Sequence, residues 1–344
     1  MKTYFWKKYR IKNTGLALSV LNNKTPFWKP FLLMIPSLIT ILLLTIIPFI
    51  LVIIGSFRVN VGFTRNDTVF GFGNFRTLFN DTTFIIAIRN SLVYAVVALP
   101  ISLSISLLIS SAISQVIKKR ARGFWQTVFF LPYVTSGIAV SLAFAFIFRS
   151  QGGLINKILL DLKIVKNPIN FLEDNSSGSW NAFFVILIRG IWGNLAFQIL
   201  ILTSSMLSVN PDLYKAASID GASSRKQFYT ITLPAISKTI SFLFTIGIIG
   251  GIKIFPLALF NNSPESALQF NGQSILLYIF AVTKTDFALA GAASIVLFIL
   301  GLALSFGLRK IVFFTLKGVR TLGEKNVVNK IKNASVLRES LFKI

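Results

Sequence analysis

The chain has 344 residues, of which 54% are hydrophobic and only 13% are charged, whereas soluble domains carry about 25% charged residues. Cysteine and histidine are absent, which excludes disulfides, thiolate metal sites and the commonest general base. Lysine and arginine outnumber acidic residues by 35 to 11, and in so apolar a chain this excess indicates cytoplasmic loops rather than nucleic-acid binding. We therefore expect a multi-pass protein of the plasma membrane, with no metal and no cofactor.

Six windows of the sequence are long and apolar enough to cross a bilayer as helices, which takes roughly 20 residues each. The sequence therefore predicts an all-α membrane protein with six transmembrane helices. The expected organisation is a basic N-terminal arm over residues 1–30, a transmembrane domain over 31–308 and a basic tail over 309–344. In chain order, the predicted spans are residues 31–57, 84–113, 124–148, 181–207, 239–260 and 287–308.

Basic residues are concentrated in one of the two sets of segments that connect these spans. The first set carries 24 basic and 4 acidic residues and comprises residues 1–30, 114–123, 208–238 and 309–344. The second set carries 8 basic and 7 acidic residues and comprises residues 58–83, 149–180 and 261–286. Because cytoplasmic loops collect Lys and Arg, we expect both termini in the cytoplasm. The arm and the tail are expected to contact anionic lipid, with a regulatory or partner-binding role as the alternative.

The six windows contain neither Asp nor Glu, which argues against a proton-coupled carrier, since such carriers relay protons through intramembrane carboxylates or histidines. The sequence also lacks a G-x-x-x-x-G-K-[ST] phosphate loop. If transport requires energy, another subunit must therefore supply it.

Polar residues inside the windows are candidates for a substrate path. Asn194 and Gln198 lie four residues apart, so they share one helix face, and Arg189 lies off that stripe. Lys253 lies in the outer half of the fifth window. An intramembrane cation indicates a functional site. The alternatives are interhelical hydrogen bonding for the two amides and outward snorkelling for the two cations.

The segment between the fourth and fifth windows, residues 208–238, reads as a helical hairpin. Asn210 and Pro211 are typical of a helix start, and Gly221 can end that helix with a positive φ. The stretch RKQFYTIT, capped by one of the two serines before it, is predicted to form a second helix that stops before Pro234. The alternative is an amphipathic interfacial loop.

The same segment carries a recognisable pattern. The stretch YKAASIDGASSRKQFYTITLPAI (214–236) resembles the EAA loop of binding-protein-dependent ABC importer permeases. The stretches FFLPYVTSGIAVSLAFAFIFRSQGGLIN (129–156) and IWGNLAFQILILTSSMLSVNPDLY (191–214) are similar to the carbohydrate-uptake subfamily, and GGLIN looks like the first permease of the pair in maltose and glycerol-3-phosphate systems. The positions that match the EAA pattern are Ala216, Ala217, Asp220, Gly221, Ala222, Phe228, Ile231, Leu233 and Pro234.

The resemblance implies a fold, a function and a set of partners. It implies the permease fold of ABC importers, with a second homologous permease, two cytoplasmic ABC ATPases and an extracellular substrate-binding protein, so that ATP hydrolysis belongs to a separate subunit. It implies a sugar, oligosaccharide or glycerophosphate-type polyol as the substrate. The residues expected to couple the ATPase to the pore are Tyr214, Lys215, Ala216, Ala217, Asp220, Gly221, Ala222 and Phe228.

Two departures from the family pattern limit what can be carried over. Lys215 stands where the family has glutamate, so an ion pair made by that glutamate does not transfer; Lys215 either contacts an acidic ATPase residue or faces solvent or lipid. The stretch KIFPLALFNNSP (253–264) replaces the F-D and G-G-P pattern of relatives. The competing functions are a stand-alone facilitator or channel, which needs no docking hairpin, and an intramembrane serine–lysine enzyme, for which no motif is present.

Overall fold

A computed structural model describes residues 28–60, 68–307 and 310 of the chain. It divides into two units, residues 1–54 and 55–344, which are considered separately. Most of the N-terminal arm (1–30) and nearly all of the tail (309–344), for which lipid contact was predicted, lie outside the described residues.

The first predicted span is helical throughout, although one turn of the helix is widened. α2 (Trp28–Ile41), the π-helical segment η2 (Leu42–Ile46) and α3 (Ile47–Ser56) follow one another without a break. The Ile47 backbone N–H bonds to the Leu42 carbonyl five residues back, and Pro48 comes next. A proline ring clashes with the carbonyl four residues before it. The wider π turn makes room for that ring and keeps the helix continuous.

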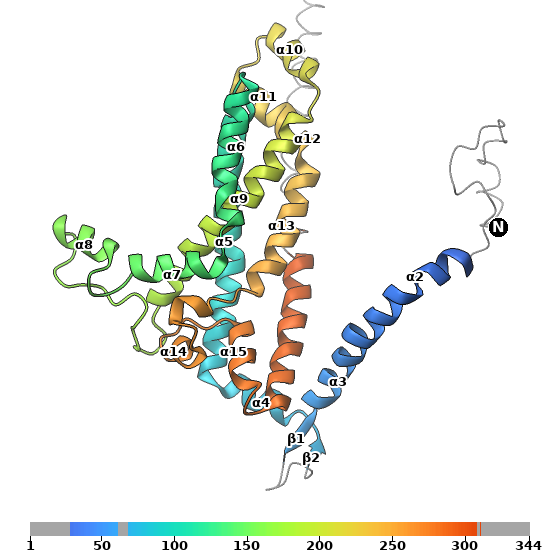
Figure 1. Cartoon of the computed structure of the whole chain (residues 1–344), viewed down its shortest axis with the longest axis vertical. Coiled ribbons are helices and arrows are strands. Elements are labelled where there is room, and N and C mark those ends of the chain that lie inside the picture. The colour runs from blue at the N-terminus through green and yellow to red at the C-terminus, as the bar shows by residue number, and fades with distance from the viewer. Residues whose placement is uncertain (1–27, 61–67, 308–309, 311–344) are drawn as a thin grey trace, which may run out of the picture. The chain divides into compact units, whose positions relative to one another are not determined.

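The second unit is built around three long helices that pack side by side: α5 (Thr82–Ser114), α9 (Asn181–Leu207) and α13 (Ser237–Ile252) (Figure 1). α5 buries a stripe of serines at four-residue spacing, Ser102, Ser106 and Ser110. Small residues in such a stripe let membrane helices approach closely. α6 (Lys119–Val134) packs against α9 and extends the bundle on one side.

The third predicted span, residues 124–148, is wrong as a single straight helix. α6 ends at Val134, α7 (Gly137–Ile147) follows, and their axes differ by 88°. Thr135 and Ser136 between them have extended backbone with ψ of 139° and 126°. Such sharp bends arise near proline and glycine, and here Pro132 precedes the break and Gly137 follows it.

The fifth predicted span, residues 239–260, also departs from one continuous α-helix. α13 ends at Ile252, and a turn leads into the short 3-10 helix η4 (Leu257–Phe260). The sixth span is the helix Phe287–Gly307. Among the described residues, five helices are long and apolar enough to cross a membrane, or six when the bent pair counts as one span. The all-α, six-span fold class is therefore confirmed.

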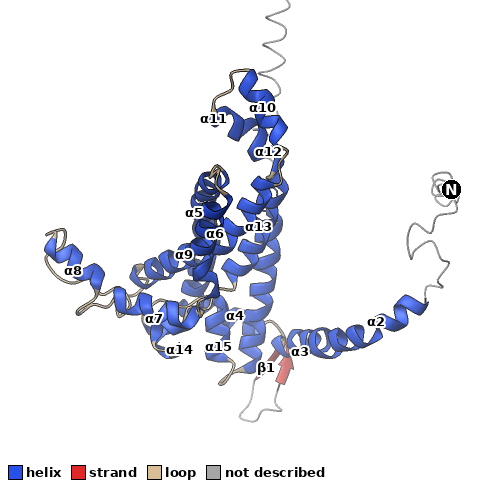
Figure 2. Cartoon of the chain, turned by 45° about the horizontal axis from the view of Figure 1, so that its top comes forward, coloured by secondary structure: helices blue, strands red, loops and turns tan. Residues whose placement is uncertain are grey.

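The segments that connect the spans contain short elements that hydropathy did not predict. β1 (Arg58–Asn60) and β2 (Thr68–Phe70) form an antiparallel pair, drawn in red in Figure 2. Apart from the segment between α9 and α13, the connecting segments contain the short helices α4 (Gly73–Asn80), α8 (Leu154–Asp161), α14 (Pro264–Gln269) and α15 (Ile275–Val282). The apolar run of α15 was missed because eight residues are too short for a span.

Candidate functional site

The segment between α9 and α13 forms the predicted pair of short helices, at the opposite end of the bundle from α4 and α14 (Figure 1). α10 (Pro211–Ile219) begins at Asn210, whose side chain accepts a hydrogen bond of 2.9 Å from the Asp212 backbone N–H. Pro211 occupies the first turn, where its missing N–H costs nothing. The predicted start of this helix is therefore confirmed.

α10 ends in a Schellman motif, the common left-handed helix ending. Asp220 is the C-cap, and Gly221 follows with a φ of 71°. The Gly221 N–H bonds to the Ser218 carbonyl at 3.1 Å, and the Ala222 N–H bonds to the Ala217 carbonyl at 2.9 Å. The positive φ of the glycine therefore turns the chain sharply, and the backbone N–H groups of Gly221 and Ala222 satisfy two carbonyls at the end of α10.

The second helix is longer than predicted. α11 (Ser224–Gln227), capped by the Ser223 hydroxyl, continues through the π-helical segment η3 (Phe228–Thr232) into α12 (Leu233–Ala235). The expectation that it stops before Pro234 is wrong. The Leu233 N–H bonds to the Phe228 carbonyl five residues back, so a π turn precedes this proline just as one precedes Pro48.

Side-chain hydrogen bonds join the two helices of the hairpin. The hydroxyls of Tyr214 and Thr232 share a bond of 2.8 Å. The Gln227 Nε2 donates to the Ser218 hydroxyl and to the Ala222 carbonyl, both at 3.0 Å. These bonds fasten the first helix to the second at both ends, which favours movement of the hairpin as one body.

The outer surface of the hairpin is partly apolar and open. Ile219 is 88% exposed and Leu213 is 51% exposed, Ala216 is also exposed, and Ala217 is half-buried. The Lys215 amine lies 2.9 Å from the Asp212 carboxylate, and both side chains are more than 70% exposed. An exposed pair of this kind contributes little to stability, so Lys215 remains available to a partner.

A second feature is a cavity of about 270 Å³ at the bend between α6 and α7. We call it the bend cavity. It brings together residues from four helices, including Tyr94 of α5, Tyr133 of α6, and Arg189, Trp192 and Asn194 of α9. Its lining combines aromatic side chains with polar groups and three glycines, so it offers both apolar contact and hydrogen-bonding groups to a small molecule.

Polar contacts within the bend cavity involve both α5 and α7. The Arg189 Nη2 donates to the Gly137 carbonyl at 3.1 Å, so the guanidinium binds the first residue of α7. Tyr94 and Asn194 line the same cavity as the Arg189 guanidinium. Tyr94 packs directly against Gly190, where an added Cβ would lie 2.0 Å from the tyrosine hydroxyl. This wall of the bend cavity therefore requires glycine at position 190, because a larger residue would collide with Tyr94.

The four residues predicted for a substrate path lie in three different places. Arg189 and Asn194 line the same cavity, although the helical stripe had suggested that Arg189 lies apart. Gln198 faces α5, where it accepts from Ser106 at 2.9 Å and donates to Ser102 at 3.2 Å. Those bonds match the interhelical alternative, because they use the amide within the bundle.

Lys253 lies elsewhere. It is the C-cap residue of α13, it is exposed, and it does not line the bend cavity. The aromatic residues of that cavity, Tyr94, Tyr133 and Trp192, were not predicted from the sequence. Trp192 lies between Gly190 and Gly193 inside an apolar window. The two nearby glycines leave space around the tryptophan ring, and this pattern could have identified Trp192 as a cavity residue.

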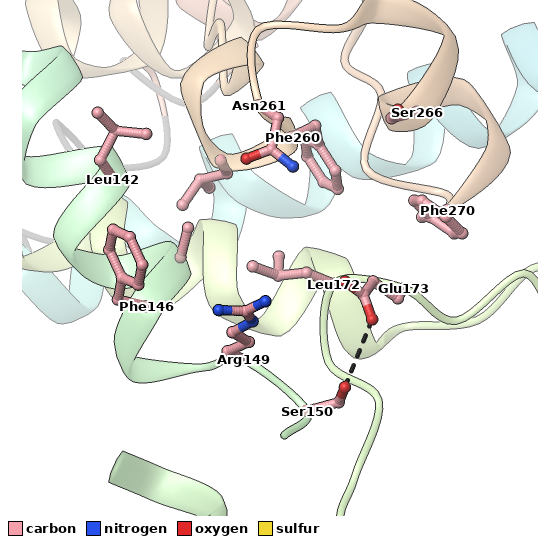
Figure 3. Close-up of a pocket in the computed structure, with 12 residues that line it drawn as sticks. Leu142, Phe146, Arg149, Ser150, Leu172, Glu173, Phe260, Asn261, Ser266 and Phe270 are labelled. Atoms are coloured by element: carbon pink, nitrogen blue, oxygen red, sulfur yellow. Dashed lines mark hydrogen bonds between the residues drawn. The ribbon is translucent and has the colours of Figure 1, made fainter. Parts of the chain in front are cut away.

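Another cavity, of about 340 Å³, lies beside the other end of α7 (Figure 3). We call it the outer cavity. Leu142, Phe146 and Arg149 line one side, and Phe260 and Asn261 line another. At its rim, the Ser150 hydroxyl donates to the Glu173 carboxylate at 3.4 Å. The sequence analysis did not predict this cavity, because it forms only when three distant segments meet.

Comparison with known proteins gives a consistent result. The family model described as binding-protein-dependent transport system inner membrane component matches residues 106–317. The probable ABC transporter permease protein MG188 of Mycoplasma genitalium is 46% identical over 88% of this chain and 91% of its own length. The arabinooligosaccharides transport system permease protein AraP of Bacillus subtilis is 29% identical over 80% of this chain and 86% of its own length.

A solved structure shares the fold. A chain of the bacterial alginate ABC transporter in complex with an alginate pentasaccharide-bound periplasmic protein superimposes with a TM-score of 0.67. The match covers 81% of this chain and 92% of that chain, at 24% sequence identity. At this identity the likeness concerns the architecture of the helices.

Proposed function

Because the chain belongs to the family of binding-protein-dependent transport system inner membrane components, we propose that it forms one half of the pore of an ABC importer for sugars or glycerophosphate-type polyols. The other half is a second homologous permease. Two cytoplasmic ABC ATPases lie beneath the two permeases, the hairpin docks in a groove on an ATPase, and an extracellular binding protein delivers the substrate. The chain then lies in the cell membrane with both termini in the cytoplasm, as the charge of its loops predicts.

The observation that carries this proposal is the position of the hairpin between two helices of the bundle. It follows α9, which ends at Leu207, and precedes α13, which begins at Ser237. α9 carries Arg189 and Asn194 of the bend cavity. Because hydrogen bonds hold the hairpin together, a push on it is transmitted to both helices as a rigid-body movement.

The predicted coupling residues fit this role in two ways. Tyr214, Asp220, Gly221 and Ala222 build the hairpin through its side-chain bond and its Schellman turn. The exposed Lys215 and Ala216, with Ile219, present a surface to the ATPase.

The bend cavity supports a sugar-like substrate. Flat aromatic rings provide apolar contact for the faces of a sugar, and a few polar groups fix its orientation; Tyr133, Trp192 and Asn194 supply both. The relative from Bacillus subtilis is named for arabinooligosaccharides, which supports the same substrate class. A volume of about 270 Å³ in one chain suits part of such a substrate, with the second permease completing the site.

The experiment that tests the proposal targets the ATPase contact. Ile219→Asp places a charge at a residue that is 88% exposed, so the fold is expected to survive while the ATPases no longer co-purify. Ile164→Asp is the matched control, because Ile164 is 64% exposed on the loop after α8. Uptake in proteoliposomes is measured with and without ATP. ATP-independent uptake by the chain alone would show that the chain is a facilitator instead, whereas unchanged ATPase binding by Ile219→Asp would contradict the assigned contact between the hairpin and the ATPase.

A further inference from the structure

Arg189 is a cation without a counterion inside an apolar part of the chain. Its Nη2 donates to the Gly137 carbonyl, while its Nε is buried and has no hydrogen-bond acceptor. The six predicted spans contain no Asp or Glu. In the part of the chain that the structure describes, the one ion pair joins Lys215 to Asp212 in the hairpin. No carboxylate of the described residues therefore neutralises Arg189.

Arg89 on α5 shows what a structural arginine looks like in the same fold. Its guanidinium donates to the carbonyls of Gly178 and Ser179 at 2.8 and 3.2 Å and to the Asn90 side chain at 3.0 and 3.2 Å. Its charge also lies 4.1 Å from the centre of the Trp180 ring. Arg89 therefore uses its hydrogen-bond donors within the fold, whereas most donors of Arg189 have no acceptor among the described residues and lie beside a cavity.

A guanidinium stays charged at any physiological pH. Arg189 is half-buried within a predicted span, where a charge is costly unless a partner compensates it. We propose that the partner is the substrate, and that Arg189 recognises a negatively charged group, a phosphate or a carboxylate, on the transported sugar or polyol. This inference rests on the proposed function, because it names the substrate class of the bend cavity. Phosphate and carboxylate share the geometry that a guanidinium binds with two parallel hydrogen bonds.

The surroundings of Arg189 are arranged for a ligand with one charged end and one sugar-like end. Asn194 and Tyr94 line the same cavity as Arg189 and carry groups that can bond to the hydroxyls of a substrate. Tyr133 and Trp192 form the aromatic part of the same lining. The bond from Arg189 to Gly137 places the cation at the first residue of α7, so a bound anion lies next to the helix bend.

The test uses the full chain assembled with its partner permease, ATPases and binding protein in proteoliposomes. The probes are two matched pairs of solutes: glycerol 3-phosphate with glycerol, and glucuronate with glucose. The variants are Arg189→Gln, which removes the charge, and Arg189→Lys, which keeps the charge but loses the Nε donor. Arg149→Gln is the matched control, because Arg149 lines the outer cavity instead.

The expected result is a charge preference that depends on Arg189. The charged member of at least one pair is taken up with an apparent KM lower by roughly tenfold or more, as a charge-assisted hydrogen bond provides. Arg189→Gln removes that preference, Arg189→Lys keeps part of it and Arg149→Gln keeps all of it. The pair that shows the preference tells phosphate from carboxylate.

Direct binding gives a second measurement on the full chain in nanodiscs. Trp192 lines the bend cavity, so the charged probe is expected to quench its fluorescence, and Trp192→Phe gives the background from the other tryptophans. ATP-dependent uptake without any charge preference, or a preference unchanged in Arg189→Gln, overturns the inference and leaves the proposed function standing. ATP-independent uptake with an Arg189-dependent preference supports the inference and contradicts the proposed function. The absence of both uptake and quenching with all four probes would also contradict the inference.

Discussion

The turn of the hairpin offers the sharpest test of mechanical coupling, because Gly221 can be changed without any steric clash. Its φ is 71°, and a Cβ added there would meet no atom within 4 Å. Gly221→Ala therefore introduces only the backbone strain of a left-handed residue, about 1–2 kcal/mol. That strain changes the ratio of intact to distorted turns roughly 5- to 30-fold.

Gly221→Pro is expected to disrupt the turn entirely. Proline holds φ near −65°, about 135° from the value that Gly221 adopts, so the Schellman turn cannot form. The substitution also removes the N–H that bonds to the Ser218 carbonyl at 3.1 Å. Asn, which tolerates the left-handed region, is the conservative replacement at this position.

The assay compares ATP hydrolysed with substrate transported in reconstituted complexes. We expect Gly221→Asn to remain coupled, Gly221→Ala to lose part of the coupling and Gly221→Pro to hydrolyse ATP without transport while remaining in the membrane. Gly152 is the matched control, since its φ is 74° and its Cβ position is also open, but it lies in the loop after α7. Normal transport by Gly221→Pro, or equal uncoupling by Gly152→Ala, would refute the assigned role of the hairpin.

Three further predictions follow from individual contacts. Gly190→Ala should lower the free energy of unfolding by about 1–3 kcal/mol, because its Cβ would overlap the Tyr94 ring. Thermal unfolding in detergent measures this loss, and an unchanged unfolding midpoint would contradict the close packing of Tyr94 on Gly190. Lys215→Ala should change the free energy of unfolding by at most about 0.5 kcal/mol, since the ion pair with Asp212 is exposed. A loss of transport at unchanged stability then identifies a partner contact. A large loss of stability would contradict the exposed position of this ion pair. Hydrogen bonds from neighbouring side chains lower the pKa of Asp174 to about 2. The stability that these bonds contribute is therefore complete above pH 4 and is lost between pH 4 and 2. Hydrogen exchange of the loop between α8 and α9, which contains Asp174, should show this loss in the wild type and not in Asp174→Asn.

Local features of the fold were predictable from the sequence alone. The fourth span was predicted at residues 181–207, and α9 occupies the same range. The caps at Asn210 and Ser223 and the positive φ of Gly221 were also predictable. Each depends on interactions within a few residues, such as a side chain that bonds to the next turn.

Hydropathy could not predict where a helix changes direction. The residues of α6 and α7 are apolar on both sides of the break, so a window over 124–148 reads as one span although the axes differ by 88°. The predicted second helix of the hairpin stops too early, before Pro234, for a related reason. Proline was assumed to end the helix, but the π turn before it accommodates the ring.

The candidate site depended on contacts between distant segments. The sequence identified membrane character, the polar residues inside the spans and the hairpin, because composition, periodicity and capping act over short distances. Only the tertiary structure separated Gln198, which bonds to two serines of α5, from Asn194, which lines the bend cavity. Only the tertiary structure showed that Arg189 bonds to the Gly137 carbonyl at the bend, 52 residues away in the chain, and that no carboxylate of the described residues pairs with it. Whether a buried polar group is satisfied depends on the helices that pack around it, and a single helix does not contain that information.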